Sequence, residues 1–152
     1  MGKRRWGFCV LLCLFFAGST ALFAGGNLVG HLSGDEEVPP VDTKAQGQAI
    51  FKLRDDSLSY KLIVANIQNV VAAHLHCAPE GANGPVGVTL FAGSPVTVNG
   101  ILAQGELLAP DPENVCGWAD LDDVIDALET GDTYVNVHTL SHLPGEIRGQ
   151  IR

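Results

Sequence analysis

Three histidines in two short segments are the residues of this chain whose types and spacing point most directly to chemistry. His74 and His76 end one apolar run, and His138 ends another. If both runs are β-strands, side chains two residues apart share a face, so His74 and His76 point the same way. A neighbouring strand would bring His138 beside them. Neutral imidazole is a ligand for copper and zinc, so such a cluster forms either a metal site or a hydrogen-bonded polar network.

The elements that must position these histidines are predicted to be short strands. Apolar runs are separated by Gly, Pro, Asn and Asp at intervals of roughly 8 to 14 residues. Residues 46–53 and 57–64 indicate a hairpin, and Asn99-Gly100 is a strong tight-turn dipeptide. The pattern predicts an all-β fold, an antiparallel sandwich or barrel of about eight strands. The candidate strands are 28–32, 46–53, 57–64, 70–76, 86–91, 96–99, 101–108, 133–138 and 146–152.

One short helix is expected between the strands. Apolar residues recur at three- and four-residue spacing over 121–128. Asp120 is placed to cap the start of this helix, and Gly131 to end it.

The first 26 residues have the features of a signal peptide rather than of a folded domain. A basic start is followed by an apolar run at 7–17, which is short for a membrane span, and then by small residues. Cleavage is expected after Ala21 or Ala24, and a retained N-terminal anchor is the alternative. Residues 27–152 would then be one mature domain, secreted or periplasmic, with no further membrane segment.

The charge of the mature chain argues against nucleic acid as a partner. Removing residues 1–26 takes away three of the 9 basic residues and none of the 17 acidic ones, so the net charge falls from −8 to −11. DNA, RNA and anionic membranes all bind clusters of Lys and Arg.

Cysteine use is consistent with export. Cys77 and Cys116 are the two cysteines left in the mature chain, and an even pair in an oxidising compartment predicts a disulfide. The alternative is that Cys77, beside His76, binds a metal as a thiolate.

Several segments together resemble the CHRD domain, the module named from chordin. The first is residues 74–90, HLHCAPEGANGPVGVTL, and the others are YVNVHT at 134–139 and PGEIRGQI at 144–151. The opening LSGDEEVPP at 32–40 is similar to the family's usual N-terminal segment. The motifs occur in the family's order, and the resemblance covers about residues 28–152.

The resemblance implies an immunoglobulin-like or superoxide-dismutase-like β-barrel and a stand-alone exported member of the family. In chordin these modules belong to an extracellular antagonist of bone morphogenetic proteins. The family usually has Asn-Pro-Gly-Gly or similar before the Glu-Ile-Arg-Gly run, whereas this chain has His-Leu-Pro-Gly at 142–145. His142 therefore adds a fourth imidazole to the candidate ligands.

The expected function is an exported binding module with an undefined extracellular protein partner and a histidine-lined site for copper or zinc. The candidate ligands are His74, His76, His138 and His142. The chain lacks the larger histidine set and the bridging residue of a binuclear dismutase, so mononuclear copper binding fits better than dismutation. A non-enzymatic role is therefore the expectation. Two alternatives remain: a copper protein with redox, dismutase-like chemistry, and a purely structural or adhesive module.

Three further polar residues are expected to have structural roles. In the structural alternative, buried histidines bond to backbone groups or to Asn136 and order the loops. Glu146 and Arg148 share a face of the last strand, so an ion pair is the default expectation. Arg148 could instead fix the loop that precedes this strand through a carboxylate or backbone carbonyls.

Overall fold

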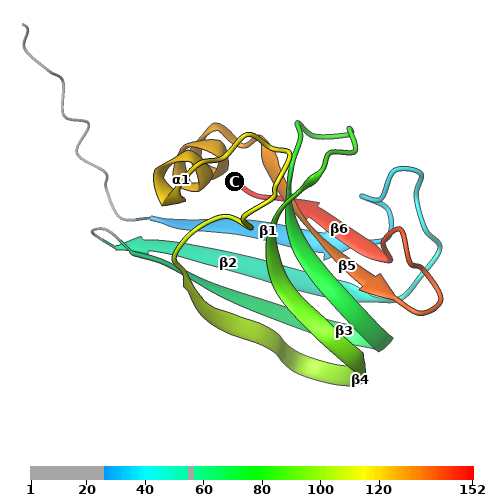
Figure 1. The fold of residues 1–152 in the computed structure, drawn as a ribbon. Coiled ribbons are helices and arrows are strands. Elements are labelled where there is room, and N and C mark those ends of the chain that lie inside the picture. The colour runs from blue at the N-terminus through cyan, green and yellow to red at the C-terminus, as the bar shows by residue number, and fades with distance from the viewer. Residues whose placement is uncertain (1–25, 55–56) are drawn as a thin grey trace, which may run out of the picture.

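Figure 1 shows the fold in a computed structural model, which describes residues 26–54 and 57–152. The predicted signal peptide lies outside the described residues, apart from residue 26. The all-β class and the short helix are confirmed, but the described residues form six strands, not about eight. The elements are β1 (Asn27–Ser33), β2 (Gln46–Arg54), β3 (Ser57–Cys77), β4 (Val86–Leu107), α1 (Leu121–Thr130), β5 (Thr133–Thr139) and β6 (Ile147–Gln150).

The strands form one antiparallel sheet that closes into a barrel. Their order is β2-β1-β6-β5-β3-β4, and β2 also pairs with β3. Closure depends on the length of β3, whose first part, 57–65, pairs with β2 and whose last part, 70–77, pairs with β5. Five strands therefore close the barrel, and β4 lies along the other edge of β3. Of the predicted alternatives the structure shows the barrel, and it does not confirm an immunoglobulin-like or superoxide-dismutase-like sandwich.

The strand number is lower than predicted because separate predicted strands are continuous. β3 includes both 57–64 and 70–76, and β4 covers the three runs predicted between 86 and 108. Asn66 and Asn69 have φ angles of 56° and 53°, in the left-handed region that asparagine tolerates better than most residues. Register shifts flank Ile67 on both sides, so β3 bulges and bends here while it remains paired with β4.

The predicted tight turn at Asn99-Gly100 was wrong. Gly100 pairs with Val64, and Val98 pairs with Ile67, so the chain continues along β3. The side-chain oxygen of Asn99 accepts a hydrogen bond of 2.7 Å from the backbone N–H of Asn66. The dipeptide thus belongs to the bend of the β3–β4 ribbon.

The last part of β3, with β5 beside it, has an apolar inner face and a polar outer face. Ala73, Leu75, Val135 and Val137 point into the barrel and are completely buried. The alternate residues carry the histidines on the outer face. Three loops contact that face, at 34–45, 78–85 and 140–146.

The predicted helix and disulfide are both confirmed. The Asp120 carboxylate caps α1, accepting from two backbone N–H groups of the first turn, and Gly131 ends the helix with φ 76°. Cys77, the last residue of β3, is bonded to Cys116, with a Cα–Cα distance of 5.8 Å. Cys77 therefore offers no thiolate to a metal. Within the described residues, no helix has the length and hydropathy required to cross a membrane.

Candidate metal centre

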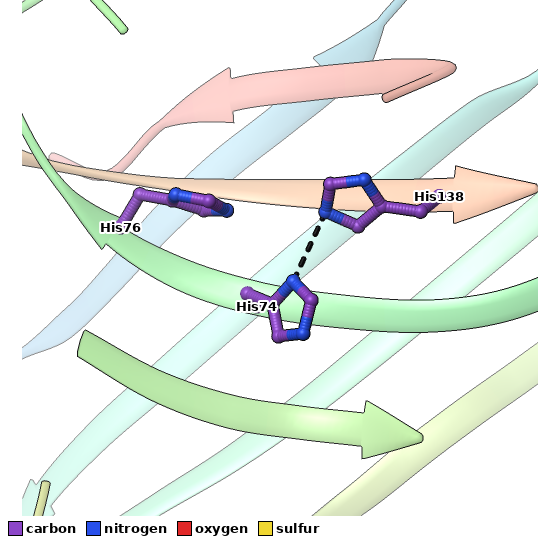
Figure 2. A group of neighbouring side chains, drawn as sticks. All are labelled: His74, His76 and His138. Atoms are coloured by element: carbon purple, nitrogen blue, oxygen red, sulfur yellow. Dashed lines mark hydrogen bonds between the residues drawn. The ribbon is translucent and has the colours of Figure 1, made fainter. Parts of the chain in front are cut away.

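The strand register brings the three histidines together. His138 of β5 pairs with Ala72 of β3, two residues before His74, so the two imidazoles are diagonal neighbours. His76 follows on the same face of β3. Figure 2 shows His76 and His138 pointing toward each other along β5, with His74 beside them on β3.

The three rings are close enough to share one ion. One ring nitrogen from each of His74, His76 and His138 lies within 4.8 Å of the other two. The Nδ1 atom of His74 is 3.0 Å from Nε2 of His138, a hydrogen bond between the two rings. We refer to these three residues as the three-histidine site.

Backbone carbonyls fix the orientation of two of the three rings. Nδ1–H of His76 donates to the carbonyl of Gly84 at 3.0 Å, and Nδ1–H of His138 donates to the carbonyl of Leu143 at 2.9 Å. Because each Nδ1 holds the proton, each Nε2 of the neutral ring has a free lone pair. Histidine ligands of metals are oriented in this way in many proteins.

The two lone pairs have different surroundings. Nε2 of His138 accepts a hydrogen bond from Nδ1–H of His74. Nε2 of His76 has no hydrogen-bond partner among the described residues. Water cannot easily replace such a partner, because His76 is only 7% exposed. An unpartnered buried acceptor costs about 1–3 kcal/mol, so this atom weakens the fold unless something binds it.

The environment keeps all three imidazoles neutral at neutral pH. Burial lowers the pKa of His76 from its usual 6.5 to about 4. Burial also lowers the pKa of His74, with a further contribution from the charge of His138, and it lowers the pKa of His138. A metal requires the deprotonated ring, so these ligands require no proton release at pH 7.

The geometry fits one copper or zinc ion only after the rings move closer together. Two nitrogens of a tetrahedral zinc site, each at about 2.0–2.1 Å from the ion, are about 3.4 Å apart. Ring nitrogens that lie within 4.8 Å of one another would therefore approach by up to about 1.4 Å, and the hydrogen-bonded pair would open slightly. The bridging proton would also move from Nδ1 to Nε2 of the His74 ring, so Nδ1 becomes the third donor and the ring stays neutral.

A stacked group behind His76 supports the site. The rings of His76 and Tyr134 are parallel within 8°, with centroids 4.7 Å apart. The Arg148 guanidinium lies 3.5 Å from the centroid of the Tyr134 ring. Arg148 also donates to the carbonyl of Ala82 at 2.7 Å and to the side chain of Asn83 at 3.1 Å. It thus fixes the loop that carries the carbonyl partner of His76.

The expected ion pair between Glu146 and Arg148 is replaced by other contacts. The Glu146 carboxylate accepts hydrogen bonds from the hydroxyls of Thr43 and Thr139, at 2.8 and 2.7 Å. Arg148 does fix a loop through a backbone and an amide oxygen, but this loop is 78–85 and not the expected one before the last strand.

His142 and Asn136 lie near the three-histidine site without being members of it. His142 is not in the three-histidine group and lines a separate cavity. Asn136 lines the same cavity and donates to Glu37 rather than to a histidine, over a long 3.4 Å. Glu37 could not be identified as a site residue from the sequence, because it lies in a proline-rich loop without periodicity. Tyr134 could have been found, since it shares a strand face with His138.

The chain belongs to the CHRD domain family, because the sequence profile of that domain matches residues 28–151. This match confirms the resemblance of the motifs that contain the three histidines. No curated protein and no solved structure matches the chain. CHRD domains are extracellular, and the Cys77–Cys116 disulfide fits that location. The family is consistent with an extracellular binding module, and the three histidines have the types and spacing of a metal site.

Proposed function

We propose that this protein is an extracytoplasmic binding module, secreted or periplasmic, that holds one copper or zinc ion at the three-histidine site. The observation that carries the proposal is Nε2 of His76, a buried and unpartnered lone pair whose ring is held by the carbonyl of Gly84. A purely structural imidazole would be expected to use both nitrogens when it is this deeply buried. Copper and zinc are the metals that neutral imidazole suits best.

A structural role for the cluster is the second candidate, and one observation favours it. His74 and His138 satisfy each other through their 3.0 Å hydrogen bond, so two of the three rings have partners without a metal. This interpretation accounts for two histidines and leaves the third unexplained. Redox chemistry at a bound copper would be a further property of the same site, and the proposal does not require it.

The test is a calorimetric titration of the metal-free protein with zinc(II) and, separately, with copper(II). We expect one ion per chain with a dissociation constant below about 100 μM. His76→Phe and His138→Gln should weaken binding by more than about 100-fold, because loss of an outer partner alone costs 10–100-fold.

His31→Gln is the matched control, since His31 is an exposed imidazole on β1, outside the three-histidine site. His142→Gln shows whether the fourth candidate imidazole contributes. Binding that is unchanged in His76→Phe, or lost equally in His31→Gln, would contradict the proposal.

A further inference from the structure

A second cavity lies on the same outer face, and His76 is one of the residues that line it. It has a volume of about 310 Å³ and is walled by Val38, Pro39, Pro40, Val41 and Pro144. Its polar lining includes Glu37, His76, Asn136 and His142. We call it the Glu37 cavity.

Two buried acceptors in this cavity lack a partner among the described residues. They are Oε1 of Glu37 and Oδ1 of Asn136, on side chains that are 6% and 4% exposed. Both oxygens lie within 2.6 Å of the same point, the position that a β-carbon on Gly145 would take. The two oxygens are therefore at most about 5 Å apart, a separation that two adjacent hydrogen-bond donors on one molecule can span.

A positive charge already acts on Glu37. Burial raises the pKa of Glu37 to about 7, and the positive charge of Arg148 opposes that rise. Arg148 is itself 2% exposed and held by Ala82 and Asn83. A cationic ligand would place a second positive charge in a poorly solvated region, so an uncharged donor is the better complement.

The remaining walls limit the size and shape of the ligand. Valines and prolines form an apolar surface opposite the acceptors, which favours a molecule with a hydrocarbon face. The volume is at the lower end of the range for ligand pockets, so the ligand is smaller than a drug-sized molecule.

We propose that the Glu37 cavity binds a small uncharged molecule with two adjacent hydrogen-bond donors, one for Glu37 and one for Asn136. Vicinal diols of polyols and sugars, and urea-type amides, both have this chemistry. The two acceptors are not candidate metal ligands, although His76 lines this cavity and also belongs to the three-histidine site.

The test uses the mature metal-free protein in EDTA and follows the backbone amide signals of Gly84 and Gly145 by NMR. One arm is ethylene glycol and glycerol, and the other is urea at low concentration. The control for the diol is 1,2-dimethoxyethane, which has the same skeleton and no donors. The control for charge is ethylenediammonium.

We expect saturable shifts with at least one of the diol and urea arms, and no saturable shift with dimethoxyethane. Glu37→Gln should weaken binding at least tenfold, because the amide supplies its own donor to Asn136. Glu36→Gln is the matched control, since Glu36 is the exposed neighbour of Glu37 on the same loop.

Three results would overturn the proposal. The first is the absence of saturable binding in both neutral arms. The second is equal binding of dimethoxyethane or tighter binding of ethylenediammonium. The third is undiminished binding in Glu37→Gln, provided that its amide spectrum remains that of the folded protein.

Discussion

Replacing His76 with phenylalanine should stabilise the metal-free protein, although it removes a buried hydrogen bond. Phenylalanine preserves the stack on Tyr134, where the rings are 4.7 Å apart. The substitution removes the bond to the carbonyl of Gly84, worth about 0.5–1.5 kcal/mol, and this carbonyl retains the Tyr134 hydroxyl at 3.3 Å. It also removes the unpartnered Nε2, which costs about 1–3 kcal/mol. The net gain in unfolding free energy is about 1 kcal/mol at pH 7.

The difference between the two proteins should grow in acid. The pKa of His76 is about 4 in the folded protein and near 6.5 when unfolded, so the unfolded chain takes up the proton first. The free energy of unfolding is therefore highest above pH 6.5, where His76 is neutral in both states, and it decreases as the pH falls toward 4. At pH 5 the loss is about 2 kcal/mol, and His76→Phe avoids it. Groups that titrate in both proteins, including Glu37, change the two unfolding free energies by about the same amount. Their contributions therefore cancel when the variant is compared with the wild type.

The assay is urea unfolding of both proteins in EDTA at pH 7 and pH 5, with the disulfide intact. We expect His76→Phe to be more stable by about 1 kcal/mol at pH 7 and by about 3 kcal/mol at pH 5. The unfolding free energy of the control variant His31→Gln should equal that of the wild type at both pH values. A variant that is less stable than the wild type by more than about 1 kcal/mol at both pH values would refute the reasoning, because His76 would then be a satisfied structural group.

Three further predictions concern the framework around the site. Arg148→Lys should lower the unfolding free energy by about 2–4 kcal/mol in chemical denaturation, because lysine cannot bond Ala82 and Asn83 together while stacking on Tyr134; a loss below 0.5 kcal/mol would contradict this. Cys116→Ser should cost about 4 kcal/mol, because the disulfide closes a loop with a sequence separation of 39, and unchanged thermal stability would be the contrary result. Asp120→Ala should cost about 1 kcal/mol by loss of the α1 cap, and an unaltered urea midpoint would count against it.

The shared face of His74 and His76 was predictable from the sequence because it depends only on strand alternation, whereas the approach of His138 also depends on the register between β3 and β5. Side chains two apart on a strand share a face whatever the remaining topology is. The helix was predictable for a similar reason, since its cap and its apolar spacing are local.

The continuity of β3 and β4 was not predictable from local signals. Asn66 and Asn99-Gly100 favour turns in isolation, but the long ribbon of β3 and β4 incorporates them as bulges. Pairing over the whole ribbon is a tertiary property, and it outweighs the local preference of the dipeptide.

The features that distinguish the site chemically were also hidden from the sequence. The partners of His76 and His138 are the carbonyls of Gly84 and Leu143, and every residue has a carbonyl. Glu37 contacts Asn136 across 99 positions, from a loop without any periodic pattern. Only the folded structure identifies which ring nitrogens are free and which buried acceptors lack partners.

The most direct test of the three-histidine site is X-ray absorption spectroscopy of the protein loaded with one equivalent of zinc or copper. We expect three imidazole nitrogens at about 2.0–2.1 Å from zinc, or at similar distances from copper. The multiple-scattering signal of imidazole should fall in His138→Gln and remain unchanged in His31→Gln. A first shell without imidazole, or a spectrum that His138→Gln leaves unaltered, would contradict the assignment of these residues as ligands.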